Sequence, residues 1–235
     1  MVGGVQPGSE FGGYRIEAVE RDGVLLARDP AEDRPVALHV AGDPPGALSS
    51  VRFLERAHRL GAVDHPHLLG VYDARTLEGR AVAVAQAPPG RRLDQLLEEG
   101  PIGPAQATRI ARQVASAVDA LEEAGAEPPP LTAERIWVDG AGDAHLDAID
   151  GGDEVLAASS SAAIARLAGA MTTHVPAPLQ TVLTRALDGA YLSAGQLAGE
   201  LHGLERSAAA RRRRIAIATA LLATLVLIAV LLIAR

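Results

Sequence analysis

The sequence predicts an α+β fold of two lobes, a small strand-rich lobe and a shortened helical lobe, followed by one apolar C-terminal helix. Short β-rich segments fill the first third of the chain, and helical patterns dominate beyond a Pro-Pro-Gly break at residues 88–90. The last segment is uniformly apolar. We therefore expect an N-terminal tail, two lobes, a basic juxtamembrane linker and a terminal helix, at residues 1–13, 14–88, 89–206, 207–214 and 215–234.

The first lobe is expected to contain three strands, a helix and two more strands. Residues 14–19, 24–28 and 35–40 are β-rich and are separated by Arg-Asp-Gly and Asp-Pro-Ala-Glu-Asp turns, which predicts an antiparallel meander. Segment 50–63 then places apolar residues on one helical face, namely Phe53, Leu54, Ala57 and Leu60. Two further strands are expected at 69–73 and 80–87.

The second lobe is expected to be mostly helical. Helical patterns cover 93–99 and 104–124, and the second pattern starts near a proline and ends at Gly125, as capping preferences favour. Two short strands, at 135–138 and 144–148, flank an Asp-Gly-Ala-Gly-Asp turn. Alanine-rich helices are expected at 160–171, 178–187 and 193–205. Because only residues 207–210 precede the arginines, we expect the last of these helices to run almost directly into the apolar one.

The composition excludes several kinds of chemistry. The chain contains no cysteine, lysine or asparagine, and all 22 basic residues are arginine. Without cysteine there is no disulfide framework, thiolate nucleophile or cysteine-based metal site. Without lysine there is no Schiff base and no phosphate-binding ammonium. The region before Arg211 carries 17 arginines against all 29 acidic residues, a net charge of −12. Such a domain repels a phosphate backbone, so we expect no nucleic-acid partner.

Residues 215–234 predict a single membrane-spanning helix. Twelve of these 20 residues are Leu, Ile or Val, and at about 1.5 Å per residue the helix spans roughly 30 Å, the thickness of a bilayer core. By the positive-inside rule, the basic residues before it place the N-terminal domain in the cytoplasm, and they are also suited to anionic lipid. These residues are Arg211, Arg212, Arg213 and Arg214. We therefore expect a single-pass protein of the cell membrane.

Several short strings follow one another in a characteristic order along residues 14–205. They are Tyr14-Arg-Ile16, Ala27-Arg-Asp29, Val36-Ala-Leu-His39, Asp64-His-Pro-His-Leu68 with Val71-Tyr-Asp73, and Pro89-Gly90 running into Leu93. In this order and spacing, with an apolar helix after them, they resemble the bacterial transmembrane Ser/Thr protein kinases. The resemblance implies a two-lobed protein-kinase-like fold over most of the chain.

The positions that carry phosphoryl transfer in that family are substituted in this chain. The resemblance implies a strand lysine, a helix glutamate, a catalytic aspartate, a metal-binding asparagine and a D-F-G aspartate. The corresponding slots hold, in that order, His39, Arg56, Pro130, Arg135 and Ala148. A usually neutral imidazole replaces an ammonium poorly. The glycine-rich loop position, 17–23, offers one glycine and three carboxylates, which would repel a triphosphate.

The segment after the D-F-G slot is also reduced. Only residues 151–159 separate Asp150 from the next expected helix, too few for an activation loop. The A-P-E motif is missing, and so is its arginine partner, expected near Tyr191. Ala37, Asp147 and Asp150 remain as candidate contacts for a nucleotide or a metal, and a shift in register would let one of the aspartates act as a metal ligand.

Other polar groups are interpreted as structural. His65 and His67 have no third ligand at useful spacing, so we expect a turn rather than a metal site. The acidic string of Asp139, Asp143, Asp147 and Asp150 is expected to be a solvated hairpin loop.

Three functions are compatible with these residues. The favoured one is a membrane-tethered, noncatalytic pseudokinase that binds a protein partner in the cytoplasm or membrane and needs no cofactor. A divergent Ser/Thr kinase using ATP and Mg²⁺ through His39 and the nearby aspartates is the second. A sensor that binds a nucleotide without turnover is the third.

Overall fold

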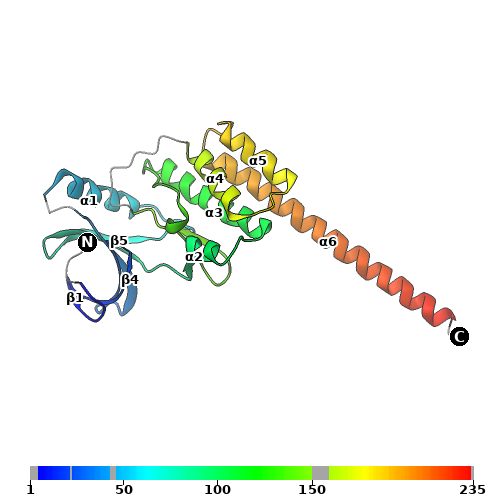
Figure 1. Cartoon of the computed structure of the whole chain (residues 1–235), viewed down its shortest axis with the longest axis horizontal. Coiled ribbons are helices and arrows are strands. Elements are labelled where there is room, and N and C mark those ends of the chain that lie inside the picture. Colours follow the sequence, from blue (N-terminus) through cyan, green and yellow to red (C-terminus); the bar gives the residue numbers. More distant parts are fainter. Residues whose placement is uncertain (1–4, 22, 43–45, 150–158, 234–235) are drawn as a thin grey trace.

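The computed structural model describes the backbone of residues 5–21, 23–42, 46–149 and 159–233, and their side chains except those of residues 212 and 221–233. In this part of the chain, a lobe built on a six-stranded sheet is followed by a helical lobe, and the last helix projects far beyond both (Figure 1). The predicted two-lobed α+β architecture is confirmed.

The sheet of the N-terminal lobe is antiparallel throughout, with the order β1-β2-β3-β4-β6-β5. Its strands are β1 (Glu10–Phe11), β2 (Tyr14–Arg21), β3 (Val24–Asp29), β4 (Arg34–Val40), β5 (Val71–Leu77) and β6 (Arg80–Gln86). The expected meander is β2-β3-β4. Strand β1 is an addition, because it lies within the expected tail.

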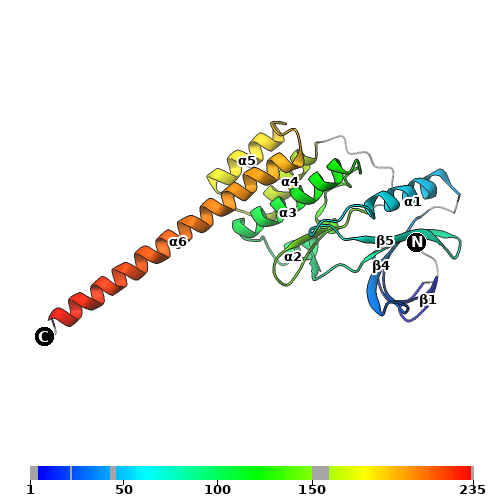
Figure 2. The ribbon, with the colours of Figure 1, turned by 180° about the vertical axis from the view of Figure 1, so that it is seen from behind.

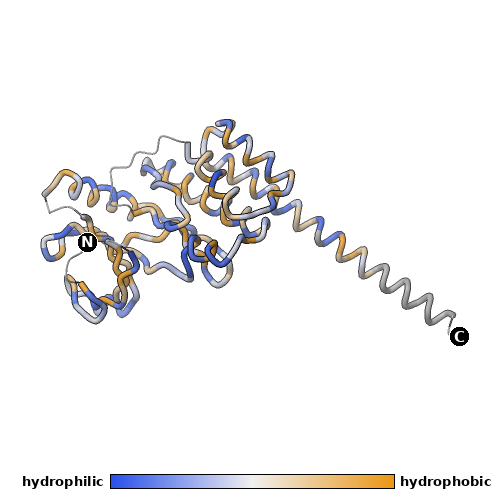
Figure 3. The backbone as a smooth tube through the Cα atoms, viewed as in Figure 1, coloured by the Kyte–Doolittle hydropathy of each residue, from blue (hydrophilic) through white to orange (hydrophobic). Residues whose placement is uncertain are grey.

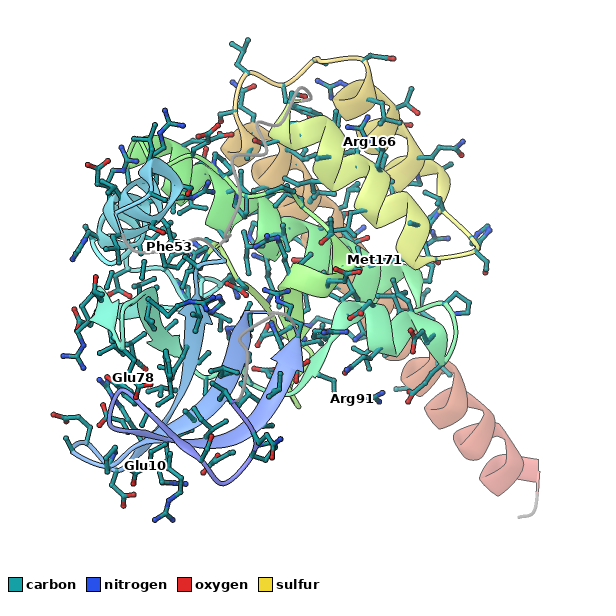
Figure 4. The ribbon with its side chains drawn as sticks, turned by 60° about the vertical axis from the view of Figure 1, so that its left-hand side comes forward. Glu10, Phe53, Glu78, Arg91, Arg166 and Met171 are labelled. Carbon is teal, nitrogen blue, oxygen red and sulfur yellow. The ribbon has the colours of Figure 1, made fainter. Side chains whose placement is uncertain are left out.

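Strand β5 extends beyond its expected end at Asp73. It continues to Leu77, which pairs with Arg80 across a two-residue turn. Both turn residues, Glu78 and Gly79, have positive φ, +46° and +73°, as the tightest hairpin turns require. The Glu78 carboxylate accepts a hydrogen bond from the Gly12 amide at 2.7 Å, and Glu10 and Glu78 lie at the same end of the sheet (Figure 4). The two outer strands of the sheet therefore approach each other.

Each face of the sheet has its own core. One core fills the curl of the sheet with buried side chains that include Ile16, Leu25, Leu38, Val82 and Val84. On the other face, alanines of β6 pack beneath helix α1 (Leu48–Leu60), whose buried stripe is Phe53, Ala57 and Leu60. The expected amphipathic helix is confirmed, and its core continues into the helical lobe.

The helical lobe is organised around helix α3 (Pro104–Glu123), which carries ten buried residues. Around it lie α2 (Leu93–Glu98), α4 (Ser160–Met171), α5 (Ala177–Leu187) and α6 (Ala194–Ile233). A small sheet of β7 (Arg91–Arg92), β8 (Ile136–Val138) and β9 (Ala144–Leu146) borders the N-terminal lobe, and the single turn η1 (Ala133–Arg135) leads into β8. Helices α3 and α6 lie side by side in both views (Figures 1 and 2).

Helix α6 is a single helix of 40 residues. Its first part packs on α3, where Arg112 forms an ion pair of 2.7 Å with Glu205. Beyond Glu205, hydrophilic and hydrophobic stretches alternate along the helix as it leaves the lobe (Figure 3). The expected continuity of the last helix is confirmed, and residues 207–214, expected to form a linker, are helical.

Within the described part of the chain, no helix combines the length and the apolar character that crossing a membrane requires. The expected span, 215–234, falls mostly on residues 221–235, whose side chains lie outside that description. The membrane-spanning helix stays a prediction.

Candidate functional site

The strand-lysine slot lies at the contact between the lobes. His39 is on β4, between Val24 of β3 and Ala83 of β6, and only 5% of it is exposed. Its Nε2 atom is 3.8 Å from Oδ1 of Asp147, which follows β9 in the helical lobe and is also buried. The chain therefore brings one of its candidate aspartates opposite the lysine slot.

Asp147, rather than Ala148, faces this slot. Its amide donates to the Arg135 carbonyl at 2.8 Å, and its Oδ1 accepts from the Ile149 amide at 3.1 Å. Ala148 is buried in the hydrophobic core. The expected D-F-G register is therefore one residue too late, and the aspartate nearest the slot is Asp147. Asp150 and most of the expected short activation segment lie outside the described residues.

The second oxygen of Asp147 is bound by an arginine of the N-terminal lobe. Nη2 of Arg21, the last residue of β2, donates to Asp147 Oδ2 at 2.6 Å, and Nη1 donates to the Glu134 carbonyl at 3.1 Å. The pairing of β2 with β3 shifts register between Ile16 and Ala18 and again between Val19 and Arg21. Such bulges re-aim side chains, which explains how the end of β2 directs a guanidinium at the other lobe.

Burial favours the neutral form of the His39 imidazole. Burial lowers the pKa of His39 and outweighs the attraction of the Asp147 carboxylate. The guanidinium groups of Arg21 and Arg135 lower this pKa further. His39 is therefore a neutral group in the slot where the family has an ammonium.

Arg56, at the position expected for the helix glutamate, makes a structural hydrogen bond. Arg56 of α1 donates from Nη2 to the backbone carbonyl of Glu127 at 2.9 Å, which ties α1 to the segment before the three prolines. Its neighbour Glu55 is exposed. Ala37, the candidate nucleotide contact on β4, is buried, on the same strand face as His39.

The catalytic-aspartate and asparagine slots hold no group suited to their former roles. Pro130 has no side-chain atom that could accept a proton, and its carbonyl accepts from the Thr132 amide at 3.2 Å. Arg135, in turn η1, donates from Nη1 to the Ile149 carbonyl at 2.8 Å. A cation therefore stands at the position where the resemblance implies a neutral metal ligand.

The residues at this site do not fit a Mg²⁺ nucleotide. A kinase holds its metal ions with two groups, an aspartate and an asparagine. Here the Asp147 carboxylate is already neutralised by Arg21 at 2.6 Å, and the second position is the cation Arg135. A divalent ion at Asp147 would meet two guanidinium groups, which repel it.

A second arginine joins the lobes beside the first. Arg92 of β7 forms a two-pronged pair with Asp94, at 2.7 and 3.0 Å, and reaches Glu20 of β2 at 3.3 Å. Sequence reasoning noted the carboxylates of the 17–23 loop but missed Arg21, Glu20 and Arg92 as contacts between the lobes. Strand periodicity could not reveal them, because the bulges in β2 break the alternation of its side chains.

The other polar groups are held by structural hydrogen bonds. His65 contacts Ser116 at 3.0 Å, and His67 contacts the Ala144 carbonyl at 3.0 Å. Asp139 accepts from two amides of its own hairpin, and Asp143 pairs with Arg109 at 2.6 Å. Across the described residues, no three His, Asp or Glu side chains gather in a way that could hold a metal ion.

The family's arginine is expected near Tyr191. In the structure, Tyr191 contacts Glu200 of α6. Its hydroxyl donates to Glu200 at 2.7 Å, and Arg185 pairs with the same carboxylate at 2.6 Å. Burial, together with this hydrogen bond, raises the pKa of Tyr191 to about 12. A tyrosine and an arginine therefore share one glutamate between α5 and α6.

Comparison with known proteins supports the kinase resemblance. The chain is 32% identical over 141 residues to serine/threonine-protein kinase PknE of Mycobacterium tuberculosis, and 30% identical over 148 residues to PknD of the same species. These alignments cover 56% and 60% of this chain but 24% and 22% of the two kinases. The chain thus spans about a quarter of the length of the curated relatives it matches. No protein-family model matches it.

Solved structures agree on the fold. The kinase domain of Mycobacterium tuberculosis PknI superposes with a TM-score of 0.69 at 18% identity, over 85% of this chain and 99% of that domain. A double mutant of the same domain gives a TM-score of 0.71. The β-rich lobe, the helical lobe and these matches together show that the chain has a two-lobed protein-kinase-like fold and is similar in sequence to mycobacterial serine/threonine protein kinases.

Proposed function

We propose that the chain is a catalytically inactive, kinase-like module that acts by binding a protein partner in the cytoplasm or membrane. The observation that carries this proposal is the pairing of Asp147 with Arg21 at 2.6 Å, which occupies the metal-ligating carboxylate. The substitutions support it, because Pro130 offers no general base and His39 offers no ammonium.

Incubation of the full chain with labelled ATP and Mg²⁺ or Mn²⁺ tests the catalytic part of the proposal. We expect no label on the chain itself or on added protein substrates. An active bacterial Ser/Thr kinase, run in parallel under the same conditions, should label itself and those substrates. Label that disappears in the Asp147→Asn variant would establish an active kinase instead.

A divergent kinase is the second candidate, because Asp147 does lie opposite the lysine slot and the relatives in sequence are named as kinases. The nucleotide sensor is separated from both by thermal unfolding with ATP, with and without Mg²⁺. We expect no change in melting temperature at millimolar nucleotide. A saturable rise without phosphate transfer would favour the sensor.

Membrane anchoring through residues 215–234 is a further part of the proposal, with the N-terminal domain in the cytoplasm. It is supported by the apolar run and by the four arginines that precede it. Carbonate extraction of cell membranes should leave the full chain in the pellet and release a chain that ends at Arg214. Release of both would refute the anchor.

The partner is sought by crosslinking in intact membranes, followed by affinity isolation. The proposal expects a protein that crosslinks to the full chain and is lost when exposed residues of the domain surface are substituted in turn. The chain that ends at Arg214 is the matched control for partners held by the bilayer segment alone.

A further inference from the structure

The buried carboxylate of Asp147 requires a counter-charge. Only 4% of its side chain is exposed, and a buried ionised carboxylate without a partner is strongly disfavoured. Its neighbour His39 makes no hydrogen bond to it, since Nε2 of His39 lies 3.8 Å from Oδ1 of Asp147. The positive charge in contact with it is Arg21, at 2.6 Å.

Arg21 reaches Asp147 from the other lobe and holds two separate elements there. One Nη atom donates to the carboxylate after β9, and the other donates to the Glu134 carbonyl in η1. The planar, permanently charged guanidinium suits such a two-point contact better than a mobile cation does. The side chain is 24% exposed, so it closes the edge of the lobe contact.

The residue before Arg21 makes the reverse contact. Glu20 accepts from Arg92 of the helical lobe at 3.3 Å, and both side chains are mostly buried. The end of β2 thus presents a cation and an anion in succession, and the helical lobe meets each with the opposite charge. Two such pairs fix the end of the β2–β3 hairpin against β7 and β9.

From this arrangement we propose that the Arg21 guanidinium takes the place of a divalent metal ion at Asp147. In this position it also links the two lobes. The proposal rests on the same Arg21–Asp147 pair as the proposed function. ATP labelling that is lost in Asp147→Asn would contradict both, whereas a wild-type response to metal without labelling would contradict this proposal alone. Removal of Arg21 should open the Asp147 carboxylate to a cation, because the nearby guanidinium of Arg135 donates to the Ile149 carbonyl at 2.8 Å.

Thermal unfolding of the full chain with and without Mg²⁺ or Mn²⁺ tests the proposal. We expect Arg21→Ala to lower the melting temperature and either ion to restore part of the loss in a saturable way, while the wild type does not respond. The double variant Arg21→Ala with Asp147→Asn should melt higher than Arg21→Ala alone and should not respond to metal. Arg28→Ala is the matched control, because Arg28 pairs with Glu17 on the exposed part of the neighbouring strand.

A second measurement locates the ion. Bound Mn²⁺ broadens nearby proton resonances, so the imidazole signals of His39 should broaden in Arg21→Ala and stay sharp in the wild type and in the double variant. If Arg21→Ala does not fold, Arg21→Gln, which can still donate to the Glu134 carbonyl, carries the same expectations. A wild-type response to metal equal to that of the variants, or a variant that does not respond, would overturn the proposal.

Discussion

Gly90 lies directly against Val138 at the junction of the lobes. Its φ is +72°, and a Cβ atom on it would collide with the carbonyl oxygen of Val138 and with the Asp139 backbone. The next residue, Arg91, pairs with Val138 in the small sheet. The Pro-Gly break in the sequence is therefore a close backbone approach that only glycine permits.

Gly90→Ala should destabilise the domain by roughly 2 to 6 kcal/mol, since backbone strain and overpacking each cost about 1 to 3 kcal/mol. Gly79→Ala is its matched control, because Gly79 has nearly the same φ, +73°, with open space around a Cβ. That control keeps the strain of a positive φ without the collision and should cost about 1 to 2 kcal/mol. Denaturant unfolding of both variants measures the difference, and equal losses would show that the contact with Val138 contributes nothing.

The neutral imidazole of His39 should make stability depend on pH. Burial and the guanidinium groups of Arg21 and Arg135 lower its pKa in the folded state, against the pull of Asp147, while the unfolded chain titrates near 6.5. Between these two values the unfolded state binds more protons, so stability is lost as pH falls below about 6.5 and is level above it.

Comparison of wild type with His39→Gln over pH 5 to 8 isolates this effect. We expect the wild type to lose up to about 1.4 kcal/mol per pH unit more than the variant in the acid range. His58→Gln, which removes an exposed histidine of α1, controls for the loss of an imidazole. Parallel pH profiles for wild type and His39→Gln would contradict the assignment.

His39→Lys, which restores the family's lysine, should not restore phosphate transfer. The ammonium would enter a site that is 5% exposed and already contains the Arg21 and Arg135 charges. We expect a lower melting temperature and no labelling from ATP, because Asp147 stays paired with Arg21 and Pro130 provides no base. The added substitution Arg21→Ala should recover part of the lost melting temperature, since one cation then replaces the other at Asp147. If Arg21→Ala does not raise the melting temperature of His39→Lys, the introduced ammonium and the Arg21 guanidinium do not compete for Asp147.

Asp119 of α3 holds the start of α6. Its Oδ1 accepts a hydrogen bond from the Gly195 amide at 2.8 Å, so it satisfies a donor in the first turn of that helix. Asp119→Ala should cost about 1 kcal/mol of stability, the usual effect of losing such a cap. Glu123→Ala, an exposed acidic residue near the end of the same helix, should cost less. Urea unfolding compares the two.

The lobes and most of their elements were predictable because their signals are local. Apolar spacing fixes α1 and α3, and turn residues separate the strands of the meander. The full length of β5 was not predictable, because a Glu78-Gly79 turn is a weak signal without the positive φ seen in the fold. The role of Arg21 was hidden for a different reason: its partners, Glu134 and Asp147, are more than a hundred positions away, and two bulges decide where it points.

Because α6 is unbroken, the number of residues along it sets how its far end is rotated relative to the folded domain. At about 1.5 Å per residue its 40 residues extend roughly 60 Å, and each residue turns the helix by about 100°. One alanine inserted between Glu205 and Ile215 would therefore rotate everything beyond it by more than a quarter turn relative to α3, while seven would nearly restore the original facing. The angular phase between the folded domain and the far end of the helix is set by residue count alone.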